Sequence, residues 1–351
     1  MSASGTKRLL LRPEDFAPSS DGLEVIGAFN PGAAELSEKV VLLVRIAERP
    51  APRPGMVGLP RWEKSGVVVD WLPESDVEFV DPRVVRIRQT GLVRLTFISH
   101  LRVVHCGEGL RVESLGPAFA PEMPWEEFGV EDARITRIDE RYYITYVAVS
   151  RHGVATALAS TEDFRTFQRE GIIFSPENKD VVLFPAKIGG RYRALHRPSG
   201  ATPFTTPEMW LAGSSDLIHW GGHQPLQFTR GAWESGRVGA GAPPVRIAEG
   251  WLILYHGNLR LTRLGEVGAY HGAALILDAD DPARVQMQSS GSILAPTETY
   301  EREGFVKDVV FPTGIVKRGD EFFVYYGAGD TSTAVWRTSV REMVAALRPI
   351  S

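Results

Sequence analysis

Residues 129–150 have the sequence GVEDARITRIDERYYITYVAVS, in which Glu131, Asp132 and Arg134 stand at the start of a β-branched run. Asp139 and Glu140 interrupt the run, and alternating aromatic and β-branched residues follow them. This pattern predicts a strand, a tight turn and a second strand. A charged cluster is therefore expected at the start of the first strand.

The same plan occurs five times along the chain. Each copy has a short strand, a polar or glycine-containing turn, and a second strand rich in aromatic and β-branched residues. The predicted hairpins occupy residues 81–97, 132–146, 184–195, 243–255 and 311–326. A second repeat, STEDF at 160–164 and GSSDL at 213–217, has a spacing of about 50 residues, within the range of propeller and solenoid repeats.

Five copies with about four strands each predict an all-β fold, a five-bladed β-propeller formed as a single domain by residues 1–351. The repeat argues against a β-sandwich and against two unrelated β domains. Residues 1–28 are expected to be an appendage. Ser339 and Glu342 form a capping-box pattern, which predicts a short C-terminal helix over about 339–348 that acts as a lid or closing element.

Other local patterns complete the expected fold. The apolar run at 39–47 predicts a strand that is buried on both faces, and FNPG at 29–32 predicts a turn. Residues 50–66, rich in Pro, Gly and Arg, are expected to form a loop before a strand at 67–71.

The composition excludes several functional classes. A net charge of −4 and a pI of about 6.1 give no overall attraction to nucleic acid or to an anionic membrane. The one cysteine, Cys106, and the lack of an N-terminal apolar segment or of a membrane-spanning apolar run predict a cytoplasmic protein without a disulfide. The eight histidines are scattered and no cysteine pair exists, so neither a metal site nor a cofactor is predicted.

The starts of the inner strands of a propeller surround its central channel, so residues at these positions are expected to share one pocket. Carboxylates and basic groups alternate there. The candidates are Glu131, Asp132, Arg134, Asn178, Lys179, Asp180, His196, Arg197, Arg237, Tyr255, His256 and Asp330.

Two reactions would use such a ring. Inverting glycoside hydrolysis needs an acid and a second carboxylate that activates water. Phosphorolysis replaces the water with phosphate, which several Lys, Arg or His donors must hold, and the basic residues favour this reaction. Glu131 and Asp132 are adjacent in a strand, so they are expected to point to opposite faces and not to act together on one substrate.

Each candidate also has a simpler explanation. Asp132 could cap a turn or pair with Arg134, and Lys179 and Arg197 could be solvated surface charges. Similarly, His256 could be a core histidine and Asp330 a turn residue. The positions of these residues at matching places in successive hairpins favour a shared site instead.

These ordered motifs resemble glycoside hydrolase family 130 over about residues 29–330. The matching segments are EDARIT at 131–136, NKD at 178–180, LFP at 183–185, HRP at 196–198, GAGAPP at 239–244, YHG at 255–257 and YYGAGD at 325–330. The family comprises mainly inverting β-mannoside phosphorylases on a five-bladed β-propeller. The resemblance implies conversion of β-mannosides, with β-1,2-linked manno-oligosaccharides as the nearest branch, and phosphate into α-mannose 1-phosphate and a shortened sugar.

The resemblance also implies residue roles. Asp132 matches the general acid, which in this family is thought to pass its proton through the mannosyl 3-hydroxyl. The matches to the phosphate-binding set are Arg45, Arg49, Lys179, Arg197, Arg237 and His256. Asn30, Asp330 and in part Arg45 match the mannosyl-binding set, and Arg134, Asp180 and Tyr255 are predicted to bind substrate with them. Ala133 departs from the family pattern, which usually has proline there.

The implied partners are a manno-oligosaccharide and inorganic phosphate as co-substrate, with no nucleic acid and no membrane. Whether the chain forms a homo-oligomer stays open. Two alternatives also remain. One is a β-mannosidase in which Asp180 or Glu234 activates water, and the other is a non-catalytic sugar-binding propeller.

Overall fold

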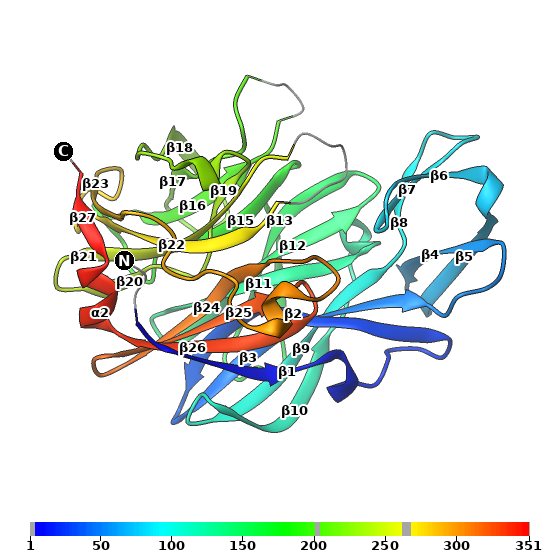
Figure 1. The fold of residues 1–351 in the computed structure, drawn as a ribbon, viewed down its shortest axis with the longest axis horizontal. Coiled ribbons are helices and arrows are strands. Elements are labelled where there is room, and N and C mark those ends of the chain that lie inside the picture. The colour runs from blue at the N-terminus through cyan, green and yellow to red at the C-terminus, as the bar shows by residue number, and fades with distance from the viewer. Residues whose placement is uncertain (1–3, 201–203, 262–267, 351) are drawn as a thin grey trace.

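The computed structural model describes residues 4–200, 204–261 and 268–350, and its regular structure is mostly β-strand (Figure 1). Most strands belong to five antiparallel units, numbered 1 to 5 here. Unit 1 contains β2 (Leu23–Leu36), β3 (Lys39–Pro50), β9 (Ile98–Gly107) and β10 (Arg111–Phe119). Unit 2 contains β11 (Gly129–Ile138), β12 (Arg141–Ser150), β13 (Gly153–Thr161) and β14 (Gln168–Phe174). Unit 3 contains β15 (Asn178–Leu183), β16 (Tyr192–Pro198), β17 (Trp210–Ser214) and β18 (Trp220–Pro225).

The last two units are completed by strands from elsewhere in the chain. Unit 4 contains β19 (Val238–Ala240) and β20 (Val245–Ile247), which both pair with β21 (Gly250–Asn258), and then β22 (Tyr270–Leu277) and β23 (Val285–Ser289). Unit 5 contains β24 (Val310–Arg318), β25 (Glu321–Ala328), β26 (Ser332–Ser339) and, as its outer strand, β1 (Thr6–Leu11). The N-terminal segment is therefore not wholly an appendage, because β1 pairs with β26.

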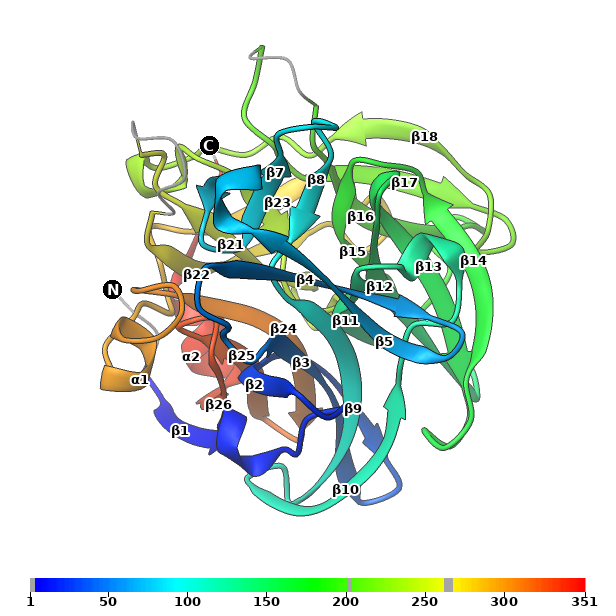
Figure 2. The same ribbon diagram turned by 90° about the vertical axis from the view of Figure 1, so that its right-hand side faces the viewer.

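The units contact one another in a closed cycle. First strands touch in chain order, β2 with β11, β11 with β15 and β15 with β19, while β24 contacts both β22 and β2. Buried apolar clusters lie between units 1 and 2, 2 and 3, 3 and 4, 4 and 5, and 5 and 1. Figure 2 shows the units following one another around the molecule in chain order. The five units thus form a closed ring of contacts, in which units 4 and 5 meet through β22 and β24.

Three of the predicted hairpins are confirmed as β11–β12, β20–β21 and β24–β25. For the hairpin at 184–195 the second strand is confirmed as β16, but its partner β15 ends at Leu183, before the predicted first strand begins. The hairpin predicted at 81–97 also forms, but it lies outside the five units. In it β7 (Val84–Ile87) pairs with β8 (Val93–Leu95), and β7 also pairs with β6 (Val77–Asp81). Unit 1 instead joins β3 to β9, two strands separated by about 50 residues, and no local pattern signals such a pairing.

Residues 56–95 form an insertion lobe between these two strands, at the right of Figure 1. It combines the β6–β8 sheet with a hairpin of β4 (Met56–Glu63) and β5 (Gly66–Pro73). The predicted loop at 50–66 is therefore wrong over β4, although the strand at 67–71 is confirmed. Pro60 suggested a loop, but a two-stranded sheet leaves one edge of each strand unpaired and so tolerates proline.

The 160–164 and 213–217 repeat is confirmed as one turn used twice. Thr161 Oγ1 accepts from the amide of Phe164, and Ser214 Oγ accepts from the amide of Leu217. Phe164 and Leu217 both have positive φ, 56° and 70°. The turn links the third and fourth strands of units 2 and 3.

Three units also share a buried tyrosine–glutamate pair. The pairs are Tyr146 with Glu126, Tyr255 with Glu234, and Tyr326 with Glu301, and each phenol oxygen lies 2.6 Å from the carboxylate. Each tyrosine is on a second strand. Each glutamate belongs to a short helix before the unit, η3 (Pro124–Glu126), η4 (Ala232–Glu234) or α1 (Thr299–Arg302), and also accepts from backbone amides there. Each pair therefore joins the short helix before the unit to the second strand of that unit.

The C-terminal helix α2 (Val340–Ala345) begins as predicted, with Ser339 Oγ accepting from the amide of Glu342 at 3.1 Å. It ends earlier than predicted, because β27 (Leu347–Pro349) pairs with β23 of unit 4. The helix therefore connects unit 5 to unit 4. Both α-helices of the described residues are too short to cross a membrane.

Candidate functional site

Three first strands carry the same irregularity at the centre of the molecule. Asn30, Asp132 and Asp180 have positive φ of 49°, 48° and 55°, and each lies where the register with the second strand shifts. Asparagine and aspartate enter this left-handed conformation more easily than other non-glycine residues. The FNPG segment is thus a bulge within β2 rather than the predicted turn. Such bulges redirect side chains, here toward the centre.

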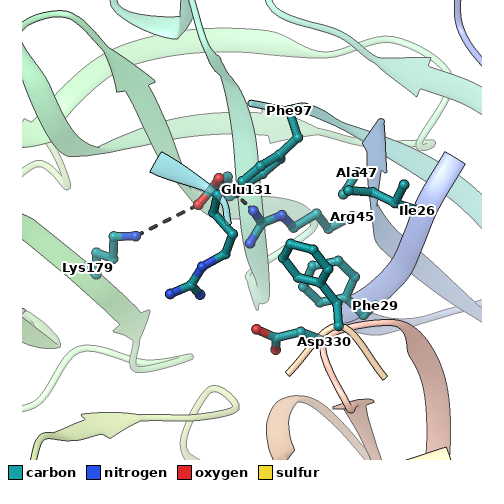
Figure 3. Close-up of a pocket in the computed structure, with 10 residues that line it drawn as sticks. Ile26, Phe29, Arg45, Ala47, Phe97, Glu131, Lys179 and Asp330 are labelled. Atoms are coloured by element: carbon teal, nitrogen blue, oxygen red, sulfur yellow. Dashed lines mark hydrogen bonds and ion pairs between the residues drawn. The ribbon is translucent and has the colours of Figure 1, made fainter. Parts of the chain in front are cut away.

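Arg45 on β3 holds one part of the site together (Figure 3). Its guanidinium lies 2.6 Å from Glu131 and 3.0 Å from Asp132, and its Nε donates to Ser99 Oγ. Asn30 donates to the same Asp132 oxygen at 2.9 Å. The expectation that Glu131 and Asp132 point to opposite faces is wrong, because the bulge at Asp132 lets both carboxylates reach one guanidinium.

Asp180 is the centre of an adjoining group of ion pairs. Its carboxylate lies 2.6 Å from Arg197, 3.2 Å from Arg134 and 3.2 Å from His256 Nε2. Arg134 also donates to the backbone carbonyl of Asp132 at 2.6 Å, which joins the two groups. Arg134 and Asp180 are only 1% and 2% exposed, and both bind other members of the group. Their predicted contact with a substrate stays a prediction.

A glycine makes room for this group. A Cβ atom on Gly239 would lie 2.2 Å from Asp180 Oδ2 and 2.8 Å from the His256 ring. Any larger residue at 239 would therefore displace the carboxylate or the imidazole. The glycine-rich segment that follows Arg237 owes part of its composition to this contact.

The buried charges of the joined group balance one another. Arg45, Arg134 and Arg197 face Glu131, Asp132 and Asp180. Burial alone would raise the pKa of Asp132 and of Asp180, but the arginines outweigh it and hold both pKa values below the ordinary range. Burial also lowers the pKa of His256 in spite of Asp180, so the imidazole is neutral at pH 7.

A pocket of about 130 Å³ opens beside Arg45 (Figure 3). This volume is below the roughly 300–1,000 Å³ of pockets for drug-sized ligands and suits one sugar ring or a small anion. Its apolar walls are Ile26, Phe29, Ala47, Phe97 and Phe305, and its charged groups are Arg45, Arg83, Glu131, Lys179 and Asp330. This space is called the central pocket.

Four of these charged groups, all except Arg83, were predicted from the sequence. Lys179 is one-third exposed, and its Nζ lies 3.8 Å from Glu131. Burial and the neighbouring carboxylates Asp132 and Glu131 raise the pKa of Asp330 to about 6, although Arg45 opposes the shift. The central pocket therefore holds a cation near its surface and a carboxyl group that titrates near neutral pH.

Two predicted residues, Arg49 and Tyr255, are not brought into this arrangement, and a third, Arg237, lies at its exposed edge. Arg49 is half-exposed and pairs with Glu24 at 3.2 Å on the surface. Arg237 is exposed and precedes β19. Tyr255 points to the opposite side of β21 from His256, because side chains alternate along a strand, and its hydroxyl binds Glu234 in the core.

The Tyr255→Phe variant tests this placement. Loss of the hydroxyl leaves one oxygen of the buried Glu234 carboxylate without its donor, while the other still accepts from the amide of Gly231. The free energy of unfolding should therefore fall by about 1.5–3 kcal/mol. KM values for the two substrates that the family resemblance implies should stay within about twofold of wild type, since the hydroxyl does not reach the pocket. Denaturant unfolding and steady-state kinetics measure the two effects, and a large rise in KM with unchanged stability would place Tyr255 in the site after all.

The pocket also contains residues that the sequence did not single out. Arg83 comes from the insertion lobe, where Asp81 binds its guanidinium at 3.1 Å. Phe29, Phe97 and Phe305 come from three separate parts of the chain. Phe29 is adjacent to Asn30 and could have been found from it, whereas Arg83 and Phe305 belong to no repeated pattern. Among the residues that the structure describes, no group of His, Cys, Asp or Glu is arranged to hold a metal ion.

Comparison with known proteins gives consistent matches. A family model described as beta-1,4-mannooligosaccharide phosphorylase matches residues 96–348. The chain is 40% identical over 344 residues, 95% of each chain, to a beta-1,2-mannobiose phosphorylase of Listeria innocua. It is 34% identical over 244 residues, 68% of this chain and 78% of the other, to a 1,2-beta-oligomannan phosphorylase of a Thermoanaerobacter species. The structure of the Listeria innocua enzyme with beta-1,2-mannobiose superposes with a TM-score of 0.88 and 38% identity, covering 95% of this chain and 96% of that one.

Proposed function

The chain belongs to glycoside hydrolase family 130 and catalyses the phosphorolysis of β-mannosides, and we propose that its substrates are β-1,2-linked mannobiose and short β-1,2-oligomannans. The observation that supports this linkage most strongly is the 40% identity over 95% of both chains to a beta-1,2-mannobiose phosphorylase. The products are α-mannose 1-phosphate and a sugar shortened by one mannose. The cycle of five units is, in this proposal, a five-bladed β-propeller with the central pocket at its axis.

The linkage needs a direct test, because the matching family model is described by β-1,4-linked substrates. The purified protein should be incubated with β-1,2-mannobiose or with β-1,4-mannobiose, each with and without phosphate. The proposal requires mannose 1-phosphate from the β-1,2 compound at a much higher rate and only with phosphate. Free mannose appearing equally fast without phosphate would indicate a hydrolase, and faster turnover of the β-1,4 compound would refute the proposed linkage.

We assign the general acid to Asp132. Its carboxylate is ionised in the ligand-free arrangement, since Arg45, Arg134 and Asn30 lower its pKa against the effect of burial. An acid must carry a proton, so binding of substrates has to raise this pKa. Phosphate beside Arg45 and Lys179 would do so, because an added anion disfavours a second negative charge nearby. Phosphate therefore acts both as the nucleophile and as the anion that raises the pKa of Asp132 and keeps it protonated.

The phosphate site is assigned to Lys179, Arg45, Arg197, Arg237 and His256, with Arg49 left out because it pairs with Glu24. The three buried arginines are already balanced by carboxylates, so the attraction for phosphate has to come mainly from Lys179 and from basic groups nearer the surface. Asn30 and Asp330 are assigned to the mannosyl unit. Arg134 and Asp180 hold the cluster in place.

The Lys179→Ala variant should raise the KM for phosphate by about 10- to 100-fold, the value of one charge-assisted hydrogen bond. The KM for mannobiose should change less than about threefold. Lys187→Ala is the matched control, because Lys187 lies in the same unit but is exposed and stacks on Tyr192. Equal effects of Lys179→Ala on both substrates would contradict the assignment.

The pH profile should report Asp330. The pKa of this carboxyl is raised to about 6, so the ionised form that accepts sugar hydroxyls is lost as the pH falls through that value. The kcat/KM for mannobiose is therefore expected to decline below about pH 6. In Asp330→Asn the overall rate should be lower and this acid limb should disappear. If the decline of kcat/KM below pH 6 persists unchanged in Asp330→Asn, it is caused by the titration of another group.

The hydrolase alternative needs a free carboxylate that can activate water. Asp180 is unsuited, since three cationic or donor groups hold it and keep its pKa low. Glu234 is unsuited as well, because it binds Tyr255 and the amide of Gly231 away from the pocket. Neither base that the sequence offered is therefore in position. The non-catalytic alternative would require that the wild type turn over no mannoside.

A further inference from the structure

A second pocket lies between the N-terminal segment, β10 and the insertion lobe, with a volume of about 470 Å³. It is called the outer pocket, and its polar lining comes from Ser19, Trp62, His100 and Arg102. The outer and central pockets have no lining residue in common. They are therefore separate sites.

The strand β9 separates the two pockets. Ser99 faces the central cluster, where its hydroxyl accepts from Arg45. His100 and Arg102 lie at the alternate positions along β9, where His100 Nδ1 is 3.7 Å from Glu48, and both line the outer pocket. Because successive side chains of a strand point to opposite sides, the outer pocket is on the far side of this strand from Arg45.

Two of the polar groups that line the outer pocket, the Trp62 indole and the Arg102 guanidinium, can only donate. Trp62 Nε1, His100 Nδ1 and Arg102 Nε are buried, and none has a hydrogen-bond partner among the described residues. His100 is only 5% exposed, and burial together with Arg102 lowers its pKa to about 4, so its ring is neutral at pH 7. Glu48 is occupied, since both its oxygens accept from Ser19.

Buried donors without partners are uncommon in folded proteins and call for an explanation, for which a ligand is one candidate. A neutral sugar would bring hydroxyl donors of its own and would need several acceptors, whereas the three side chains offer only one, the unprotonated nitrogen of His100. A phosphate group instead carries several acceptor oxygens and a negative charge that suits the guanidinium of Arg102. The donor set therefore matches an oxyanion.

We propose that the outer pocket binds a phosphate group, either as inorganic phosphate or as the phosphate monoester of a sugar. Its volume leaves space for a sugar attached to the phosphate. Trp62 and Phe16 provide aromatic surface on which the sugar ring can lie. This site is additional to the phosphate site beside Arg45.

Equilibrium dialysis of the full-length protein with radiolabelled phosphate, and separately with α-mannose 1-phosphate, tests the proposal. The wild type should bind two phosphate groups per chain. Arg102→Gln should weaken the second one at least about tenfold and leave turnover unchanged, since Arg102 does not touch the central pocket. Arg111→Gln is the matched control, because Arg111 is an exposed arginine at the start of β10. It should bind both groups like the wild type.

A second variant, Trp62→Phe, removes the indole N–H donor but keeps an aromatic side chain. It should weaken binding of phosphate to the outer pocket. Lys179→Ala separates the two sites, since it should spare the outer one whether or not Lys179 binds phosphate in catalysis. If Arg102→Gln weakens the binding of mannose 1-phosphate but not that of inorganic phosphate, the monoester is the ligand. Identical binding of both ligands to wild type and Arg102→Gln, or a single site throughout, would overturn the proposal.

Discussion

The Asp132→Asn variant is expected to lose about 10²- to 10⁴-fold in kcat for β-1,2-mannobiose, which is the usual contribution of a general acid. Asparagine tolerates the left-handed conformation of residue 132, where φ is 48°. Its amide oxygen can still accept from Asn30 and Arg45. The loss should therefore come from the missing proton donor and not from a changed fold. Rates of mannose 1-phosphate formation at saturating concentrations of both substrates measure it.

Two controls distinguish acid catalysis from a change in local charge. Glu131→Gln also removes a carboxylate from Arg45, 2.6 Å away, but removes no acid, so its kcat should fall less than about tenfold. An aryl mannoside with a good leaving group needs little protonation and should be much less sensitive to Asp132→Asn. Equal losses of kcat in the two variants, or equal losses in Asp132→Asn with both kinds of substrate, would show that Asp132 is not the general acid.

The Asp180→Asn variant is expected to give the largest loss of stability, about 3–5 kcal/mol of unfolding free energy, because it leaves buried cations without their counter-charge. Arg134 and Arg197 both lose an ionic partner in this variant. Asparagine again fits the backbone, where φ is 55°. The loss is a large fraction of the roughly 5–15 kcal/mol that stabilises a typical protein. Denaturant unfolding followed by fluorescence measures it.

The pH dependence of stability gives an independent check. The folded-state pKa of Asp180 is lower than the unfolded one, so its contribution is complete above the ordinary aspartate pKa and is lost as the pH falls toward the folded value. The difference between wild type and variant should thus shrink in acid. Glu140→Gln is the control, since the exposed Arg137–Glu140 pair should contribute less than about 1 kcal/mol. A loss of unfolding free energy in Asp180→Asn as small as that in Glu140→Gln would contradict the prediction, because it would mean that the buried arginines find other partners.

The sequence was most informative where structure is local. The hairpin at 129–150 and the repeated turn at 160–164 and 213–217 involve neighbouring residues, and both are confirmed. Unit 1 could not be predicted in this way. Its second and third strands are separated by the insertion lobe, and the lobe itself contains strands that imitate the expected hairpin.

In the candidate site, too, local features could be predicted from the sequence and long-range ones could not. Asp132 and Lys179 could be selected from their positions in the repeat and Asn30 from the family resemblance, and the structure places them around one pocket or cluster. Their orientation could not be predicted, because a bulge cancels the alternation from which strand directions are inferred. Arg83 was also out of reach, since it enters from the lobe. Tyr255 was misplaced, because the repeated tyrosine–glutamate pair becomes recognisable only when three units are compared.

The pairing of β1 with β26 has a consequence for biosynthesis. Leu9 pairs with Ala334, so about 325 residues must be translated between the two partners. At roughly 5–20 residues per second this takes about 15–65 s, during which the strand made first has no partner. Unit 5 can close only when nearly all of the chain has been made. Until then the unpaired edge of the nascent protein is open to other chains, and chaperones that shield such edges would be most useful in this interval.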